Sequence, residues 1–329
     1  MESDVKLVVM RSFNHDYAVD FRASFARLGV AATIVEAPLF ELSDMRPAHV
    51  AAVQAMLRPG RPGQRVLFCP GVMELFPHGD HHGLHFSAYR DWHDPARRTV
   101  LPHPWTVHAP FAPAQVAWSG KPPLSVGFMG SAYADALPVR AARLLPPAVR
   151  RRLLRGRYLR HPQALARGYA ARVPLRFALA FPRAESLATL RRGAAAHPGM
   201  TLDLTDTGGF TGRQDAKDRY ARAMLSTTYV LCPRGSENFS FRQYEALQAG
   251  RVPVIVDTDM VLPDAVPWKE VAVVVPYDRL DRIADIIAED YRRHDAAAFL
   301  HRQRRALEVA ETLRDGQWLD RELSRVLAA

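Results

Sequence analysis

The sequence predicts an α/β protein of two domains, each with a parallel sheet wrapped by helices. Its 329 residues are long for one hydrophobic core and comfortable for two domains with a cleft between them. Short apolar runs alternate with helical stretches, which is the pattern of parallel sheets. This alternation stops between Gly71 and Pro123 and then resumes. The balance of 48% hydrophobic and 24% charged residues is that of a globular protein.

The first third of the chain reads as alternating strands and helices. Short apolar runs predict strands at residues 6–10, 32–35 and 65–69. Longer stretches between them predict helices at residues 17–28 and 47–57. This β-α-β opening predicts that the first sheet is parallel.

The stretch between Gly71 and Pro123 lacks a clear period and is rich in His, Pro and Trp. It predicts long loops and a crossover between domains. We therefore place the first domain at residues 1–120 and the second at residues 121–329.

The second half resumes the alternation. Helical stretches are expected to about residue 170, and one or two amphipathic helices fill the tail from 296 to 327. The runs RVLFCPG and YVLCPRG indicate equivalent strands in two similarly built halves. Strands are predicted at residues 124–128, 177–181, 201–204, 229–232, 252–256 and 271–275, with the clearest helices at 216–225 and 280–290.

Composition excludes several classes of protein. Two cysteines, Cys69 and Cys232, are too few for a disulfide framework or a cysteine-built zinc site. The acidic start of the chain does not resemble a signal peptide, and no apolar run reaches the roughly 18 residues that cross a bilayer, so we expect a cytoplasmic protein. The net charge of +10 is almost entirely arginine, a bias that a GC-rich genome also produces, so it indicates little about partners.

The most informative segment runs from Cys232 to Val256. It reads as the end of a strand, a loop, a helix and a second strand. Ser240 and Gln243 fit a capping box at the start of the helix, and Gly250 fits its end.

A loop that leaves the carboxyl end of a parallel strand and enters a helix suits an anion, because free N–H groups and the helix dipole both face it. Arg234 lies in this loop and can bind a diphosphate bidentately, and Arg242 can add a second charge. Glu245 can accept hydrogen bonds from two ribose hydroxyls. The alternative is that Arg242 and Glu245 merely pair on a solvated helix face.

The motifs PRG, SFR, YEALQAG and VPV in this segment resemble the signature of the exostosin family of glycosyltransferases. MGS at 129–131 and VLP at 261–263 are similar to that family as well. The match is close over some 25 positions and loose over the rest of the second half. Unlike the eukaryotic members, the chain is expected to have no membrane anchor and has a short first half, so nothing supports a heparan-type acceptor. We expect a bacterial member of the family.

The resemblance implies the GT-B fold, in which two Rossmann-like domains face each other across a cleft and C-terminal helices pack back. It implies inverting, metal-independent transfer without a cofactor, from a nucleotide sugar, with a UDP-sugar favoured, to a glycan or lipid-linked glycan of a surface polysaccharide. The second domain would hold the donor. The expected donor-binding residues are Gly130, Ser131, Arg234, Gly235, Ser236, Asn238, Ser240, Arg242 and Glu245.

The catalytic base is expected in the first domain, at Asp80, His81 or His82, because inverting transfer needs a group that takes the acceptor's proton. Asp80-His81 resembles an Asp-His pair of many exostosin-like sequences. Two alternatives stay open: that these are ordinary loop histidines, or that a histidine cluster binds a metal. The cluster comprises His78, His81, His82, His85 and His93.

The stretch from Arg140 to Arg183 carries many arginines and no acidic residue. It predicts either contact with an anionic membrane or a solvated helical face, and RNA binding is a weaker option because no nucleic-acid motif accompanies it. Two other functions also stay open: a catalytically silent protein that binds a nucleotide or glycan, and an epimerase that needs no acceptor.

Overall fold

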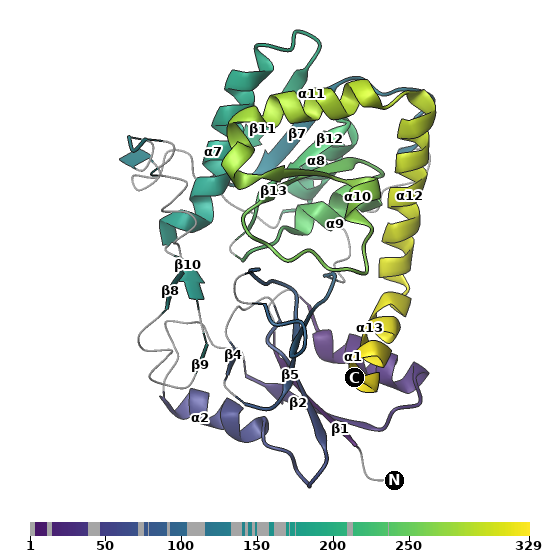
Figure 1. The fold of residues 1–329 in the computed structure, drawn as a ribbon. Coiled ribbons are helices and arrows are strands. Elements are labelled where there is room, and N and C mark those ends of the chain that lie inside the picture. The colour runs from purple at the N-terminus through teal and green to yellow at the C-terminus, as the bar shows by residue number, and fades with distance from the viewer. Residues whose placement is uncertain are drawn as a thin grey trace.

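The computed structural model of this chain has two lobes, joined along one side by a long helix (Figure 1). The first lobe holds the N-terminus, and the second lies above it in this view. The structure describes residues 4–11, 15–38, 47–71, 76–77, 79–90, 93–103, 116–132, 140–141, 144–146, 149, 158–160, 169–170, 172–174, 176–208, 213–235 and 237–329.

The first domain is a five-stranded sheet with the strand order β2-β1-β3-β5-β6, and every neighbouring pair is parallel. The predicted β-α-β opening is confirmed. The strands β5 and β6 fall in the stretch that we expected to be loops, and that expectation is wrong there. Both strands are too short to show a period. The elements are β1 (Val5–Met10), α1 (Tyr17–Arg27), β2 (Ala32–Ala37), α2 (Pro47–Met56), β3 (Arg65–Cys69), β5 (His82–His85) and β6 (Arg98–Val100).

The second domain repeats this plan, with the parallel order β11-β7-β12-β13-β14. In each sheet the first strand in the chain lies between the second and the third. β3 and β12 are the third strands, which confirms that RVLFC and YVLC are equivalent. The elements are β7 (Ser125–Gly130), α7 (Arg176–Ala194), β11 (Thr201–Asp206), α8 (Gln214–Leu225), β12 (Tyr229–Cys232), α9 (Phe241–Gln248), β13 (Val252–Asp257), α10 (Trp268–Val271), β14 (Val273–Pro276), η2 (Tyr277–Arg282) and α11 (Ile283–Arg293).

The strand predicted at residues 177–181 is wrong, because this segment lies inside the helix α7 with Pro182 in its interior. Its sequence FALAF contains no β-branched residue, and Ala and Leu are good helix formers. A short apolar run fits either state, and the proline suggested an end that the helix does not have.

Four two- or three-residue strands lie outside the main sheets. β4 (Phe76–Pro77) pairs with β9 (Tyr169–Ala170), and β8 (Tyr158–Arg160) pairs with β10 (Arg172–Pro174). The helical expectation for residues up to 170 is therefore wrong at β8 and β9.

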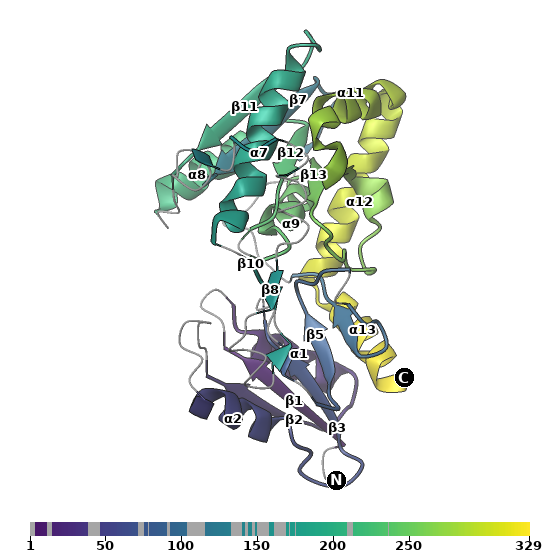
Figure 2. The ribbon, with the colours of Figure 1, turned by 60° about the vertical axis from the view of Figure 1, so that its left-hand side comes forward.

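Two C-terminal helices return the chain to the first domain. α12 (Ala296–Arg314) runs down the side of the molecule, and α13 (Gln317–Ala328) lies beside α1 (Figures 1 and 2). Asp320 accepts hydrogen bonds from Ser24 and from Arg27, whose Nε lies 2.7 Å from Oδ2. The predicted packing of the C-terminal helices back onto the first domain is confirmed.

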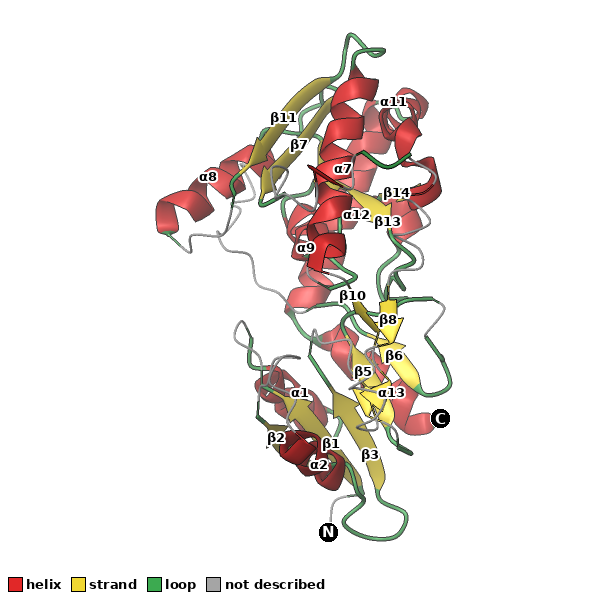
Figure 3. Cartoon of the chain, turned by 90° about the vertical axis from the view of Figure 1, so that its left-hand side faces the viewer, coloured by secondary structure: helices red, strands yellow, loops and turns green. Residues whose placement is uncertain are grey.

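The carboxyl ends of the two sheets meet at the domain boundary. Asn238, after β12, donates its backbone N–H to Ser87 Oγ at 2.9 Å and its side-chain amide to the carbonyl of Ala88 at 3.2 Å, both of which follow β5. Arg90 forms ion pairs with Asp257 at 3.0 Å and Asp259 at 3.2 Å. Figure 3 shows the two sheets stacked end to end. Two Rossmann-like domains that face each other in this way form the GT-B fold that the sequence predicted. Among the described residues, no helix is both long and apolar enough to span a bilayer.

Candidate functional site

The strand order of each sheet reverses beside its first strand, and in open α/β sheets ligands bind at that point, outside the carboxyl ends of the strands. In the second domain this point lies between β7 and β12. β7 ends at Gly130 and is followed by Ser131, and β12 leads directly into Arg234 and Gly235. The structure therefore brings these four predicted residues to one edge of the sheet.

Arg183, near the middle of α7, joins the two loops at this edge. Its Nε donates to the carbonyl of Arg234 at 2.8 Å, and its Nη1 donates to the carbonyl of Ser131 at 2.7 Å. Sequence reasoning placed Arg183 only at the end of the basic stretch, because the segment before it was read as a strand. The contact fixes the loop after β12 against the loop after β7.

Arg234 is buried, with 1% of its surface exposed, and its guanidinium lies 5.7 Å from the ring centroid of Tyr89 in the first domain. The loop around it is tight: the Gly235 N–H donates to the carbonyl of Phe239 at 2.6 Å, and a Cβ on Gly235 would lie 3.3 Å from that oxygen. A glycine is therefore the residue that this loop accommodates most easily.

Arg242, in the first turn of α9, is buried against the end of β7. It donates to the carbonyl of Met129 at 3.0 Å, and its guanidinium lies 4.5 Å from the ring centroid of Phe128. A Cβ on Gly130 would lie 2.4 Å from Nη2 of Arg242. The guanidinium therefore occupies space that is free only because residue 130 is a glycine. Burial alone would lower the pKa of Arg242, but Tyr220, Cys232 and Glu245 raise it on balance, so the guanidinium stays charged.

Glu245 is also buried, one turn further along α9, and accepts a hydrogen bond from the hydroxyl of Tyr220 on α8. Burial, and then the neighbouring Glu245, raise the pKa of Tyr220 well above its ordinary value, so the hydroxyl keeps its proton. The alternative of a solvated Arg242–Glu245 pair is therefore wrong. Sequence reasoning missed Tyr220, which no motif distinguishes from other helical aromatic residues.

Two of the other predicted donor-site residues have structural contacts. Asn238 bridges the domains as described, and its Oδ1 accepts a hydrogen bond from Thr258 at 2.7 Å. Ser240 is the N-cap residue of α9, but its hydroxyl makes no capping hydrogen bond, and Gln243 points to the sulfur of Met260 instead. The capping box is therefore wrong, although the start of the helix is right. Ser236 lies outside the described residues.

The equivalent point in the first sheet, between β1 and β3, is filled by aromatic rings. Tyr17 is 2% exposed, stacks on Phe86 with centroids 4.6 Å apart, and shares a 2.6 Å hydrogen bond with Nε2 of His103. A Cβ on Gly71, which follows β3, would lie 3.2 Å from the Tyr17 ring. Aromatic side chains therefore fill the reversal point of the first sheet, whereas arginines lie at the reversal point of the second sheet.

The three predicted base candidates lie at the start of β5. Asp80 is exposed, 3.5 Å from Arg97, and His82 pairs with Thr99 through a 2.9 Å hydrogen bond. His81 is buried, with its ring centroid 5.7 Å from that of Phe68. Burial is the main cause that lowers the pKa of both histidines to about 4.

The first domain's hydrogen bonds to the loop after β12 come from residues other than these candidates. The contact with Asn238 is made by Ser87, which lies beyond the end of β5, and the strand itself spans about 10 Å from His82 to His85 at 3.3 Å per residue. The loop after β5 therefore contacts the second domain through Ser87 and Ala88.

The metal-binding alternative finds no support in the described part of the chain, where no group of three or more His, Cys, Asp or Glu side chains is arranged to hold an ion. His78 lies outside that part. Most of the basic stretch from Arg140 to Arg183 also lies outside it.

Comparison with known proteins finds a family model that is similar to the part of the chain around this site. Residues 177–289 match the model of the exostosin GT47 domain. The rice protein "Probable glucuronosyltransferase GUT1" is 39% identical over 75 residues, which are 22% of this chain and 18% of that protein. The Arabidopsis thaliana protein "Probable beta-1,4-xylosyltransferase IRX10" is 41% identical over 63 residues, which are 18% and 15%. A glycosyltransferase structure from Rickettsia africae aligns over 98% of this chain and 97% of its own, but with 8% identity and a TM-score of 0.41, too low to support an argument.

The matched segments are short: they span less than a fifth of the length of these curated relatives. The family model nevertheless runs from α7 through α11 and includes Arg183, Arg234, Arg242 and Glu245. Residues 177–289, about a third of the chain, are therefore similar to the exostosin GT47 domain.

Proposed function

We propose that this protein is a glycosyltransferase that takes a sugar from a nucleotide sugar and passes it to a glycan or glycoconjugate. The observation that carries the proposal is the meeting of three arginines, Arg183, Arg234 and Arg242, at the reversal point of the second sheet. Positive charge at this place, beside the start of a helix, suits a diphosphate. The curated relatives are named as sugar transferases.

Each part of the site has a role in this reaction. Arg234 and the start of α9 hold the diphosphate and stabilise the negative charge that forms as it leaves. Glu245 accepts hydrogen bonds from the ribose, and Tyr220 keeps the carboxylate in place. Because arginines and the helix dipole can balance the leaving group, the transfer needs no metal ion.

Finer features belong to the same proposal. The transfer inverts the anomeric carbon, the preferred donor is a UDP-sugar, and the acceptor is a glycan or lipid-linked glycan of a bacterial surface polysaccharide. The enzyme works in the cytoplasm, and the basic stretch from Arg140 to Arg183 holds it to the anionic inner face of the membrane.

The test is transfer and hydrolysis of a panel of UDP-, GDP- and CMP-sugars, together with the shift in melting temperature that each nucleoside diphosphate causes. We expect one nucleotide to stabilise the protein. We also expect the variants Arg234→Ala and Glu245→Ala to lose most activity while keeping the fold. Wild-type turnover in both variants would overturn the proposal.

A catalytically silent nucleotide-binding protein is the second candidate. The observation in its favour is that the first domain contacts the loop after β12 through Ser87 and Ala88, and not through the base candidates at the start of β5. Stabilisation by a nucleotide without transfer or hydrolysis of any donor in the panel would select this function.

A further inference from the structure

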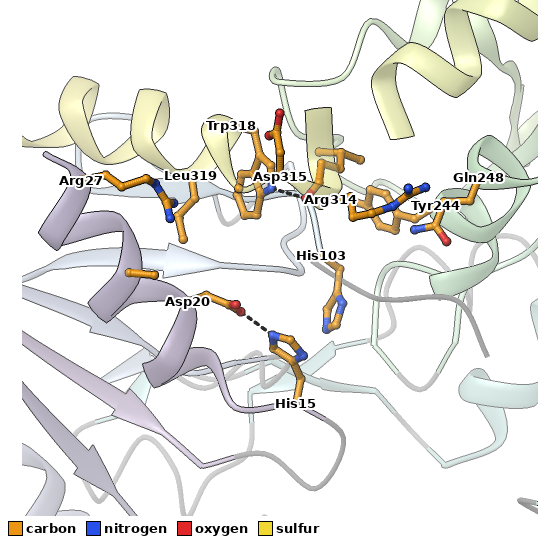
Figure 4. Close-up of a pocket in the computed structure, with 13 residues that line it drawn as sticks. His15, Asp20, Arg27, His103, Tyr244, Gln248, Arg314, Asp315, Trp318 and Leu319 are labelled. Atoms are coloured by element: carbon orange, nitrogen blue, oxygen red, sulfur yellow. Dashed lines mark hydrogen bonds and ion pairs between the residues drawn. The ribbon is translucent and has the colours of Figure 1, made fainter. Parts of the chain in front are cut away.

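A pocket of about 310 Å³ lies between the two domains, beside the start of the first helix (Figure 4). Its walls come from α1, from α9 and from the turn that joins α12 to α13. This volume is at the lower end of the range for small-molecule sites. The buried side chains of Tyr244 and Trp318 and the polar groups of Gln248, Arg314 and Asp315 line it, and these polar groups suit the hydroxyls of a sugar.

The pocket contains a histidine, His15, that is hydrogen-bonded to a carboxylate, Asp20. Nε2 of His15 and Oδ2 of Asp20 share a hydrogen bond (Figure 4). The side chains are 21% and 33% exposed, so the pair is accessible from the pocket and yet shielded from bulk water. A carboxylate that binds one ring nitrogen fixes the tautomer and leaves the other nitrogen to accept a proton.

The local sequence explains why Asp20 is available for this contact. Asp16, at the N-cap of α1, accepts the hydrogen bond from the N–H of Ala18 that the start of the helix requires. Asp20, one turn later, lies on the side of α1 that lines the pocket. The two neighbouring carboxylates therefore have different partners.

A short chain of ring contacts connects His15 with the loop that carries Arg234. The ring of His103 lies 6.1 Å from that of His15 and stacks on Phe239 at 5.7 Å with an interplanar angle of 12°. The carbonyl of Phe239 accepts the N–H of Gly235, the residue after Arg234. The rings of His103 and Phe239 thus lie between His15 and the loop that carries Arg234.

We propose that this pocket is the acceptor site and that His15 is the catalytic base, with Asp20 as its positioning residue. The proposal rests on the glycosyltransferase function. The Nδ1 of His15 takes the proton of an acceptor hydroxyl while that oxygen forms its bond to the anomeric carbon of the donor. The bond between the anomeric carbon and the diphosphate oxygen breaks, and its electron pair leaves with the nucleoside diphosphate. The proton then passes from His15 to solvent.

The test compares His15→Gly and Asp20→Asn with the wild type, using the donor that the panel identifies. We expect His15→Gly to lose about 10²–10⁴-fold in kcat, as removal of a general base does, while the nucleotide's stabilising effect on the melting temperature is unchanged. Added imidazole should restore part of the lost rate. Asp20→Asn should lower kcat with little change in the KM of the donor, because the histidine keeps its place but loses its fixed tautomer.

Two matched controls bound the result. Asp16→Asn changes the neighbouring carboxylate, and His301→Gln changes an exposed histidine on α12; neither should lower kcat more than about twofold. If the wild type transfers sugar and His15→Gly transfers it equally well, the assignment of His15 is overturned. If His82→Ala instead abolishes transfer in a folded protein, the base lies at the start of β5. A wild type that neither transfers nor hydrolyses any donor would refute the proposed function itself.

Discussion

Arg183 donates hydrogen bonds to the backbone of two loops from the middle of α7, and its contact with Arg234, at 2.8 Å, ends on the carbonyl of the residue proposed to hold the diphosphate. The second contact ends on Ser131 at 2.7 Å. A side chain that no motif identified therefore fixes how the loops after β7 and β12 lie relative to each other.

Substitution of Arg183 should weaken the donor site without unfolding the protein. Each hydrogen bond from a charged donor is worth about 1.5–3 kcal/mol, so Arg183→Ala should weaken nucleotide binding at least tenfold. Isothermal titration with the stabilising nucleoside diphosphate measures this. Arg192→Ala, on the same helix but bonded to Thr189, is the control and should bind normally. Equal affinity in the two variants would contradict the role of Arg183.

A side chain in place of the glycine at the end of β7 should displace Arg242. In Gly130→Ala the new Cβ would lie 2.4 Å from Nη2 of Arg242, so the guanidinium must move and lose its bond to Met129. We expect a loss of about 1–3 kcal/mol in unfolding free energy, together with weaker nucleotide binding. Urea denaturation and titration measure the two effects.

Gly199→Ala is the matched control, because its Cβ would meet no atom within 4 Å. It should change the unfolding free energy by no more than about 0.5 kcal/mol. A Gly130→Ala variant as stable as this control would show that the site around Arg242 is looser than described.

Asn238 should stabilise the contact between the two domains. Asn238→Ala removes the side-chain bonds to the carbonyl of Ala88 and the hydroxyl of Thr258, and leaves both groups buried without them. The expected cost is about 1–3 kcal/mol in unfolding free energy. Urea denaturation tests this, with Gln214→Ala, an exposed amide on α8, as a neutral control. Identical denaturation midpoints for the two variants would contradict this stabilising role of Asn238.

Stability should fall in mild acid because of buried histidines. Burial lowers the pKa of His81 and His82 to about 4 in the folded state, below the ordinary value of 6.5. The unfolded chain then binds more protons between these values, so their stabilising effect is complete above about pH 6.5 and is lost as the pH falls towards 4. Urea midpoints measured from pH 7.5 to 4.5 should show this loss.

The variant His81→Gln should flatten that pH dependence, because glutamine does not titrate, even if its stability at pH 7.5 is lower. His301→Gln, at an exposed position on α12, should leave the slope unchanged. A slope in His81→Gln equal to that of the wild type would locate the acid sensitivity elsewhere.

Most of the sheet framework could be predicted from the sequence, because its strands are continuous apolar runs with clear ends. β3 and β12 are correct to the residue, and the end of α9 follows from Gly250, whose φ of 59° is the left-handed conformation that glycine favours. β5 was missed because HGLH has neither an apolar run nor an alternation. α7 was misread because a short Ala-, Leu- and Phe-rich run is compatible with both a strand and a helix.

The site residues that lie close together in the sequence were predicted, and those that come from distant segments were missed. Arg234, Arg242 and Glu245 lie within twelve residues of one another, so a motif could identify them. Arg183 and Tyr220 reach the same place from two other helices, and only the sheet order brings them there. The pair His15 and Asp20 faces the second domain through a pocket that needs α12 and α13 for its walls, so no pattern within the first domain could indicate it.

The position of α13 beside α1 affects the order in which the chain can assemble. Arg65 donates to the carbonyl of Val326 at 2.8 Å, and Asp320 is bound to Ser24 and Arg27, so residues near the two ends of the sequence cover one another. During synthesis the first sheet emerges early, but its contacts with α13 can form only after residues 317–328 have been made. By then the strands of the second sheet and their helices have all been synthesised. The last helix of the chain therefore packs on the domain that begins it, so the half that leaves the ribosome first is the last to be finished.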